Sequence, residues 1–334
     1  MQSASSPTVS VIIIVFNGAK YIRGAIESVF KQTFNDFEIV VVDDGSTDNT
    51  KSVLEPWIRE GRIRYYYQQN KGPSGAYNTG VHLAKGKFVK FLDCDDFLYP
   101  QQLEIQVNHL QNKSEDVVSV TDFEFEFDRQ NRKKGNLWLE KKDRQLAQFI
   151  KDNPCPGHTI LISRNLIEQA GGYDEKLFSY EDSDLWVRTL LQGAIFEKLD
   201  YVGCCYRILG DSVSSDPEKM FRQRCKFYEK LNRIILPKSS QMRDDVLRQL
   251  LSSNTMLIDM CFARKINPVS CIPTILETSS IIYAQKVNKS KKLLLKAVGF
   301  KNIAKLKYIK TCLRNRNYNS SLLNTPWRNE ENYT

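Results

Sequence analysis

The chain has 334 residues, of which 41% are hydrophobic and 26% are charged, and its formal net charge is +9 at pH 7. This length and composition exclude a disordered chain and a small disulfide-stapled domain, and they favour one catalytic domain with an appendage. The eight cysteines show no CxxC spacing, so we expect reduced thiols and a cytoplasmic location.

The N-terminal residues lack the pattern of a signal peptide. Residues 1–8 contain no basic segment, and the apolar run from Val9 to Phe16 is too short to cross a bilayer. We therefore expect neither a signal peptide nor a transmembrane helix.

The first half of the chain alternates strands with helices. Runs of β-branched and aromatic residues predict strands over residues 9–15, 38–42, 63–67 and 88–92. Apolar residues at helical spacing predict helices over residues 22–30 and 76–84, and a further helix is expected to run to about residue 59 from a cap at Ser46 or Thr47. Short connections and right-handed crossovers then predict a doubly wound, parallel α/β sheet.

Three carboxylates follow the fourth predicted strand. Asp93, Asp95 and Asp96 carry like charges that raise one another's pKa unless a cation lies among them, and hard oxygen ligands suit Mg²⁺ or Mn²⁺. Asp43 and Asp44 end the second strand, and open α/β sheets bind ligands at the carboxyl ends of their strands. An acidic turn in water is the alternative for the cluster taken alone.

Three other α/β folds are less consistent with the sequence. No GxGxxG motif follows the first strand and no P-loop motif occurs, so neither a dinucleotide fold nor a P-loop fold is supported. A receiver-like fold would also place acids at strand ends, but it is much shorter and would leave the second half of the chain unexplained.

The second half supplies another group of acids. Strands are predicted over residues 117–127, 159–163 and 195–207, with a charged linker over residues 129–142. Glu181, Asp182 and Asp184 open a helix that ends at Gly193. Acids in a first helical turn favour the helix dipole without any catalysis, an alternative that applies most to Asp184 because Glu181 and Asp182 are expected to precede the turn.

Beyond residue 215 the sequence changes to helices with basic faces, predicted over residues 217–236, 241–264, 272–286 and from 291 onward. We therefore expect a catalytic domain over residues 1–215 and a basic, mainly helical extension over residues 216–334. Eleven lysines and arginines with no acid among them lie between Lys286 and Arg316. They indicate either a core-packed helix with a solvated basic face or a helix on an anionic membrane surface. Nucleic acid ranks last as a partner, because no nucleic-acid motif accompanies the charge.

Five segments together resemble the family 2 glycosyltransferases of the GT-A fold: Pro7–Asn17, Val42–Asp48, Asn70–Gly72 with Asn78–Gly80, Phe91–Asp96 and Glu181–Trp186. The resemblance covers residues 7 to 215. It implies an α/β, mostly parallel but mixed sheet of the GT-A type. It also implies an inverting transferase that moves a sugar from a nucleoside diphosphate donor to a hydroxyl of a glycan, lipid-linked or polysaccharide acceptor in cell-surface polysaccharide synthesis.

The resemblance assigns roles around the donor. Phe16 would lie against the base, and Asp44 would accept the N3–H of uracil, a proton that cytosine lacks, so a UDP-sugar donor is favoured. Asp93 and Asp95 match the DxD motif and would hold Mn²⁺ or Mg²⁺, with Asp95 the better metal ligand and Asp93 on ribose or metal. Further donor-site candidates are Val15, Asn17, Lys71, Asn78, Cys94, Arg207 and Ser212.

The resemblance also assigns the reacting acids. Asp182 matches the catalytic base that takes the proton of the acceptor hydroxyl, and Glu181 would position it. His158 lies in a loop rich in proline and glycine near the expected sugar site, where it is either structural or functional.

Two positions depart from the family pattern. Tyr77 stands where the family commonly has the arginine of Ala-Arg-Asn, and Lys71 is a candidate substitute. Leu209 stands where the family has the histidine of Tyr-Arg-x-His, which leaves Arg207 and Ser212 as candidates for its role.

These departures keep open a catalytically silent relative that binds a nucleotide or glycan. A further alternative is a nucleotidyltransferase on a similar α/β sheet, which would use the same metal-binding acids but release pyrophosphate in place of UDP. The expected partners are a UDP-sugar and a glycan or lipid-linked acceptor, with no nucleic acid, and an anionic membrane surface is a candidate partner of the C-terminal helices. The expected location is cytoplasmic, with a peripheral position at the inner face of the membrane as the alternative.

Overall fold

A computed structural model describes residues 6–127, 131–209 and 216–235, together with residues 245, 246, 248, 249, 252 and 253. The chain divides into two compact units, Met1–Ser215 and Asp216–Thr334. In the second unit the longest described element is the helix α8, Pro217–Ile235. The expected helices over 241–264, over 272–286 and from 291 lie outside the described residues, apart from short pieces of the first.

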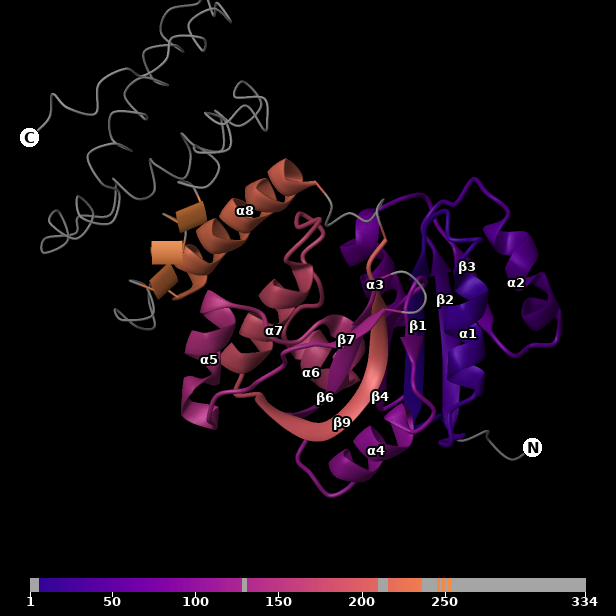
Figure 1. Cartoon of the computed structure of the whole chain (residues 1–334), viewed down its shortest axis with the longest axis horizontal. Coiled ribbons are helices and arrows are strands. Elements are labelled where there is room, and N and C mark those ends of the chain that lie inside the picture. Colours follow the sequence, from indigo (N-terminus) through magenta and orange to yellow (C-terminus); the bar gives the residue numbers. More distant parts are fainter. Residues whose placement is uncertain are drawn as a thin grey trace, which may run out of the picture. The chain divides into compact units, whose positions relative to one another are not determined.

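The first unit is built on one mixed β-sheet (Figure 1). Nine described strands belong to it, in the order β3-β2-β1-β4-β8-β6-β9-β5, with β7 paired to β6. Their bounds are β1 Val9–Val15, β2 Phe37–Asp43, β3 Arg64–Tyr67, β4 Phe88–Asp93, β5 Phe97–Leu98, β6 Val117–Glu126, β7 Arg132–Lys134, β8 Ile160–Ser163 and β9 Ile195–Arg207.

Helices connect the strands and cover the sheet. Their bounds are α1 Ile22–Phe30, α2 Thr50–Arg59, α3 Gly72–Leu83, α4 Gln102–Leu110, α5 Lys142–Lys151, α6 Arg164–Gln169 and α7 Glu181–Leu191, with a short 3₁₀ turn η1 at Gly157–Thr159. The stripe of α1 predicted from its spacing is buried, as an amphipathic helix lying on a sheet requires.

The strand directions confirm the predicted mixed sheet. Strands β3, β2, β1 and β4 are mutually parallel, β6 and β9 are parallel, and β8 runs antiparallel to both β4 and β6. In the parallel register Val15 lies beside Asp43, and Ile14 lies beside Asp93. The acids that end β2 and β4 therefore reach the same edge of the sheet, as the sequence predicts.

Two helices begin at other residues than expected. Helix α2 begins at Thr50 because Ser46 and Thr47 bind Asn17 instead of capping a helix. The backbone N–H of Asn17 donates to the Ser46 hydroxyl at 2.8 Å, and Asn17 Oδ1 accepts from the N–H of Thr47 at 2.8 Å. Helix α3 begins four residues early, at Gly72, with a proline in its first turn where the missing N–H costs nothing.

Two further expectations need correction. The charged linker over residues 129–142 contains the strand β7, which extends the sheet beside β6. Helix α7 begins at Glu181, so Glu181 and Asp182 lie inside its first turn and do not precede it.

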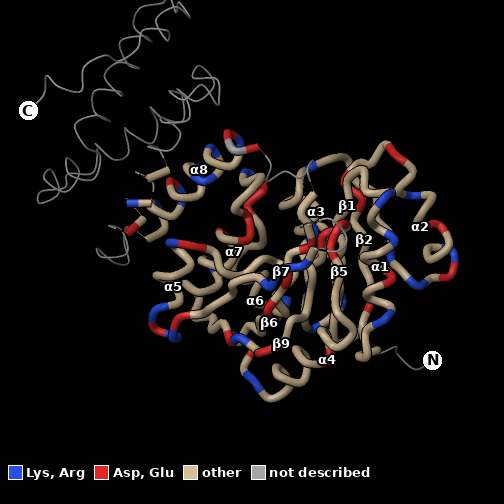
Figure 2. Tube along the Cα trace, viewed as in Figure 1, with Lys and Arg blue, Asp and Glu red and all other residues tan. Residues whose placement is uncertain are grey.

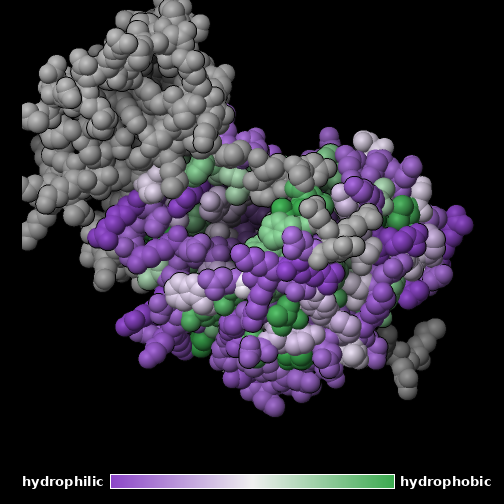
Figure 3. All heavy atoms as spheres, in the orientation of Figure 1, coloured by the Kyte–Doolittle hydropathy of each residue, from purple (hydrophilic) through white to green (hydrophobic). Residues whose placement is uncertain are grey.

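The surface of the chain is mostly hydrophilic on the face shown in Figure 3, with hydrophobic residues gathered in small patches. Each helix that the structure describes is either too short or too polar to cross a membrane.

Candidate active site

The carboxyl ends of β2 and β4 form the candidate site. Figure 2 shows acidic residues gathered at this end of the sheet, beside α3. Asp93 ends β4, and Asp95 and Asp96 follow it in the turn toward β5. The run of carboxylates is therefore at a sheet edge where ligands of α/β folds bind.

Asp93 and Asp95 have strongly perturbed acidities. Burial and the charges of Asp96 and Asp95 raise the pKa of Asp93 to about 7. Burial and Asp96 raise the pKa of Asp95 to about 6, although Arg207 opposes the rise. Crowded carboxylates with hard oxygen atoms fit a divalent cation such as Mg²⁺ or Mn²⁺, which would add to the partial compensation by Arg207 and His158.

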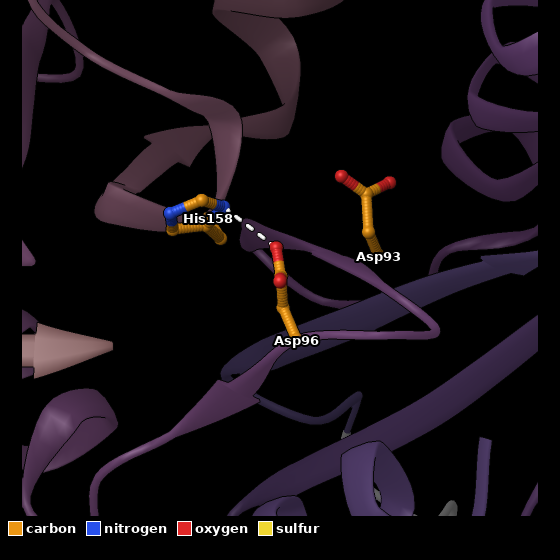
Figure 4. Close-up of side chains that lie close together, drawn as sticks. All are labelled: Asp93, Asp96 and His158. Carbon is orange, nitrogen blue, oxygen red and sulfur yellow. Dashed lines mark ion pairs between the residues drawn. The ribbon is translucent and has the colours of Figure 1, made fainter. Parts of the chain in front are cut away.

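A second group of possible metal ligands overlaps the first. Asp93, Asp96 and His158 each offer one ligand atom, and these atoms lie within 4.8 Å of one another. Figure 4 shows the imidazole of His158 and the carboxylate of Asp96 pointing toward each other, with Asp93 alongside. The geometry thus brings Asp93, Asp96 and His158 together, whereas Asp95 acts on Asp93 through its charge.

The Asp96–His158 pair is deeply buried, with the two residues 0% and 4% exposed. Nδ1 of His158 lies 3.1 Å from Oδ2 of Asp96, and Oδ1 of Asp96 accepts the backbone N–H of Arg207 at 2.9 Å. Burial opposes the charge on His158, but the Cys204 sulfur and the Asp96 carboxylate raise its pKa well above its usual value. Asp96 thereby ties the end of β4 to η1 and to the end of β9. Half-buried Asp95 is the more accessible partner for Asp93.

Asp182 lies in the first turn of α7 and is held by two donors. The backbone N–H of Gly157 donates to Oδ2 at 2.8 Å, and the Tyr173 hydroxyl donates to Oδ1 at 3.1 Å. A Cβ at Gly157 would lie 3.0 Å from Oδ2, so the glycine permits this close approach. Burial nevertheless raises the pKa of Asp182, against the effects of Tyr173, Gly157 and His158.

Glu181 is the neighbour of Asp182 in the same turn. Burial and the charge of Asp182 raise the pKa of Glu181 to about 8, with a smaller contribution from Asp93. Its Oε2 atom is buried and has no hydrogen-bond partner among the described residues. Such a carboxyl is protonated at neutral pH and can donate a hydrogen bond.

Asp184 has a structural environment. It is 0% exposed, and Nη2 of Arg188 lies 2.6 Å from its Oδ2. Arg188 also donates to the carbonyls of Ala170 and Gly172, so the pair fastens α7 to the preceding loop. These contacts support a structural role for Asp184, the alternative that the sequence also allows.

Asp44 is surrounded by donors from the loop before α3. Its Oδ1 accepts from Nε2 of Gln68 at 2.6 Å and from the N–H of Lys71 at 2.8 Å, and its Oδ2 accepts from the N–H of Gly72 at 2.8 Å. Asp44 thus shapes the loop directly. The Oδ2 atom, with one donor, keeps the capacity for a further hydrogen bond.

Other donor-site candidates surround the end of β1. Phe16 is 53% exposed, so its ring is available for stacking, whereas Val15 is buried. Asn17 has a φ of 53°, in the left-handed region where asparagine is tolerated, and it binds the loop after β2. The Cys94 thiol has a pKa well above its usual value because of burial and the flanking carboxylates.

The structure places the three remaining donor-site candidates in different environments. Asn78 uses its side chain on the chain itself, since Nδ2 donates to the carbonyl of Tyr173 at 2.9 Å and Oδ1 accepts the N–H of Tyr173 at 2.8 Å. The guanidinium of Arg207 packs against the rings of Tyr21 and Phe97. Ser212 lies outside the described residues.

The structure also adds residues to the sequence-based site. Tyr77 donates its hydroxyl to Oδ1 of Asp93 at 2.6 Å, and Tyr173 donates to Asp182. In the sequence Tyr77 figures only as a departure from the family pattern, and Tyr173 carries no signal beyond its place in the Gly171-Gly172 turn. The sequence does not predict the Asp96–His158 pair. It identifies Asp96 only as one of three neighbouring acids and His158 only by its place in a loop.

The sequence is similar to those of known glycosyltransferases. Residues 10–171 match the model of the family described as Glycosyl transferase family 2. Over 204 residues the chain is 33% identical to an uncharacterized glycosyltransferase of Rickettsia typhi, a match covering 58% of this chain and 62% of that protein. Over 215 residues it is 31% identical to chondroitin synthase of Escherichia coli, covering 62% of this chain and 30% of the synthase. The matches thus span less than two thirds of the length of these relatives.

Solved structures share the fold. The chain superposes on S. aureus TarS 1–349 in complex with UDP-GlcNAc with a TM-score of 0.64 at 20% identity, covering 92% of this chain and 91% of that one. It superposes on a mannosyltransferase of Pyrobaculum calidifontis in complex with GDP-Man and Mn²⁺ with a TM-score of 0.53 at 16% identity, covering 90% and 88%. These likenesses confirm the predicted GT-A type of α/β sheet.

Proposed function

The chain belongs to glycosyltransferase family 2, and from this premise we propose that it transfers a sugar from a UDP-sugar to an acceptor hydroxyl with inversion at the anomeric carbon. The observation that carries the proposal is the meeting of two kinds of acid at one sheet edge. Asp93 and Asp95 crowd the end of β4, and Asp182, with a raised pKa, faces the same region from α7.

The chemistry divides between these acids. The acceptor hydroxyl becomes strongly acidic only as it bonds to the anomeric carbon, so a carboxylate within hydrogen-bond reach can take its proton late in the step. A raised pKa makes Asp182 a stronger base than an ordinary aspartate, which suits this task. Glu181, whose pKa is about 8, would stay protonated beside it and position either Asp182 or the acceptor.

Asp93 and Asp95 would hold Mn²⁺ or Mg²⁺. A divalent cation there would neutralise the negative charge of the departing diphosphate. The raised pKa values of both carboxyls fit this assignment, since a bound cation favours their ionised forms. The mannosyltransferase neighbour, solved in complex with GDP-Man and Mn²⁺, supports the same class of metal.

A uridine donor is supported by two observations. The structural neighbour TarS is described in complex with UDP-GlcNAc, and the Asp44 carboxylate lies at the end of β2 beside exposed Phe16. We propose that Oδ2 of Asp44 accepts the N3–H of uracil while Phe16 lies against the base. Val15, Asn17, Lys71, Cys94, Arg207 and Ser212 remain proposed donor-site residues, whereas Asn78 is proposed to shape the site through Tyr173.

The proposed acceptor is a glycan, a lipid-linked sugar or a polysaccharide, and the matched chondroitin synthase makes cell-surface polysaccharide synthesis a suitable context. The acid-free basic stretch between Lys286 and Arg316 supports a peripheral position at the cytoplasmic face of an anionic membrane.

The test is a panel of nucleotide sugars incubated with and without Mn²⁺. We expect UDP release from at least one UDP-sugar, faster with the metal, and faster still with the correct acceptor. Release of pyrophosphate in place of UDP would show a nucleotidyltransferase. Tight UDP binding without turnover of any donor would show a catalytically silent relative, a second candidate that the departures at Tyr77 and Leu209 favour.

A further inference from the structure

Two tyrosines lie stacked between the two carboxylates of the proposed reaction. The rings of Tyr77, on α3, and Tyr173, in the loop before α7, are 5.2 Å apart and inclined by only 21°. The Tyr77 hydroxyl donates to Oδ1 of Asp93 at 2.6 Å. The Tyr173 hydroxyl donates to Oδ1 of Asp182 at 3.1 Å. Each ring of the stack thus ends on one functional acid.

The stack is enclosed by the core. Tyr77 and Tyr173 are 6% and 3% exposed. Phe91 packs its ring edgewise against both, at 5.0 Å and 5.3 Å between ring centres. Burial and the nearby carboxylates raise the pKa of both phenols, so each keeps the proton that it donates.

The backbone around Tyr173 is fixed from two sides. Asn78, the residue after Tyr77 on α3, binds both the N–H and the carbonyl of Tyr173. Arg188 of α7 donates to the carbonyl of Gly172 at 2.6 Å. One helix turn of α3 therefore places Tyr77 directly and Tyr173 through Asn78.

Packing alone does not require the hydroxyl groups. A phenylalanine at either position would fill the same space and stack in the same way, because the two rings differ only by the hydroxyl. The informative feature is that both hydroxyls end on a carboxylate, and on different ones. Removing either leaves a partly buried carboxylate oxygen without its donor, which is costly.

We propose that Tyr77 and Tyr173 act as one positioning unit that sets Asp93, in the donor site, and Asp182, the proposed base, relative to each other. Tyr77 occupies Oδ1 of Asp93 and so leaves Oδ2 to face a metal ion or ribose hydroxyl. Tyr173 orients the Asp182 carboxylate with the help of Gly157. The inference rests on the proposed function, because it assigns the two acids to donor and acceptor.

The experiment compares Tyr77→Phe, Tyr173→Phe and the double variant. The matched control is Tyr99→Phe, because Tyr99 also donates its hydroxyl to a carboxylate, that of Glu124, outside the proposed site. Two readouts are needed: kcat and KM for the UDP-sugar that the wild type uses, and calorimetric binding of UDP with Mn²⁺.

The two single variants should fail differently. We expect Tyr77→Phe to weaken UDP·Mn²⁺ binding and raise the donor KM about tenfold, with a smaller effect on kcat, since a hydrogen bond to a charged group contributes about that factor. We expect Tyr173→Phe to lower kcat about tenfold and to leave UDP·Mn²⁺ binding within about twofold of the wild type. The double variant should deviate from the product of the single effects, because losing one hydroxyl frees the stack to shift and so alters the carboxylate that the other hydroxyl holds.

Other outcomes overturn the inference. If both variants keep the constants of the Tyr99→Phe control, the hydroxyls position nothing. If both lose binding and turnover equally, together with thermal stability, the stack is core packing only. If the wild type binds UDP·Mn²⁺ but turns over no donor, the proposed function is wrong, and binding alone then decides: Tyr77→Phe must still weaken it while Tyr173→Phe does not.

Discussion

Nζ of Lys90 donates a 2.8 Å hydrogen bond to Oε1 of Gln106 inside the core, where both residues are 0% exposed. Lys90 belongs to β4, the strand that ends at Asp93. Burial lowers the pKa of Lys90 to about 7. A buried amine so close to neutrality makes the stability of the domain depend on pH.

Replacing this lysine should therefore stabilise the protein in a pH-dependent way. Between pH 7 and the unfolded value near 10.5 the unfolded chain binds more protons at this site, so wild-type stability rises with pH. The gain in unfolding free energy from Lys90→Met should thus be about 3 kcal/mol larger at pH 7 than at pH 9.5. Urea denaturation at both pH values measures it.

The control for this experiment is Lys51→Met, since Lys51 is an exposed lysine of α2. Its effect should be small and equal at the two pH values. A Lys90→Met gain that does not shrink between pH 7 and pH 9.5 would show that Lys90 titrates as an ordinary lysine.

Removing the basicity of Asp182 should stop transfer without preventing binding. Asp182→Asn keeps shape and polarity, so UDP and metal binding should survive while kcat falls by roughly 10²- to 10⁴-fold, the usual range for loss of a general base. Asp184→Asn is the comparison: it breaks the ion pair with Arg188 and should lower thermal stability while the folded fraction stays active. If Asp182→Asn keeps near-normal transfer while Glu181→Gln loses it, Asp182 is not the base and Glu181 takes that role.

The acidic limb of the pH profile should depend on Tyr173. Because the base must be ionised, kcat falls as the pH drops through the pKa of Asp182, which burial raises above that of an ordinary aspartate. The Tyr173 hydroxyl lowers this pKa, so Tyr173→Phe should move the limb toward higher pH. Glu181 and His158 act on the same carboxyl in both proteins, and the Tyr99→Phe profile should match the wild type. If the acidic limb of Tyr173→Phe coincides with that of the wild type, the Tyr173 hydroxyl does not act on the catalytic base.

Asp95 should govern metal-dependent binding. Asp95→Asn removes one charged oxygen ligand, and we expect the affinity for UDP in the presence of Mn²⁺ to fall about tenfold or more, toward the value measured with EDTA. Isothermal titration calorimetry with Mn²⁺ and with EDTA measures both. Glu60→Gln, at an exposed acid after α2, is the control. If Asp96→Asn abolishes the metal effect while Asp95→Asn retains it, the metal belongs with Asp96 and His158.

The basic stretch between Lys286 and Arg316 predicts salt-sensitive membrane binding. The full chain should float with liposomes containing phosphatidylserine at low ionic strength and should dissociate as salt is added, because the attraction is screened. Neutral phosphatidylcholine liposomes serve as the control. Equal flotation with both lipids, or with neither, would remove the electrostatic basis of the prediction.

The sheet and its acidic edge could be predicted because they follow from local patterns. A β-branched run such as β1 predicts a strand, and parallel strands joined by crossovers end at one edge, so Asp43 and Asp93 had to reach the same edge on either side of β1. Helix starts were harder to predict. Ser46 and Thr47 have the chemistry of helix caps, but Asn17, distant in the sequence, binds both.

The internal supports of the site could not be predicted for the same reason. Tyr77 meets Asp93 across two elements, and His158 meets Asp96 only because η1 is packed against the end of β4. Such pairs are chosen by tertiary packing, and neither periodicity nor spacing carries a signal for them. The resemblance to a family located the acids, whereas the residues that hold them follow from tertiary packing.

Asn78 gives the loop before α7 an unusual anchor. A side-chain carboxamide carries the same donor and acceptor as a peptide group, so by meeting both backbone groups of Tyr173 it imitates one rung of a β-ladder where no strand runs alongside. Asn78 thereby fastens the loop at Tyr173, and the Ser74 hydroxyl holds the loop again at the carbonyl of Leu177. Insertions and substitutions between that point and α7 can change the shape offered to an acceptor without moving Asp182, which makes this segment the natural place for acceptor preference to diverge among related enzymes.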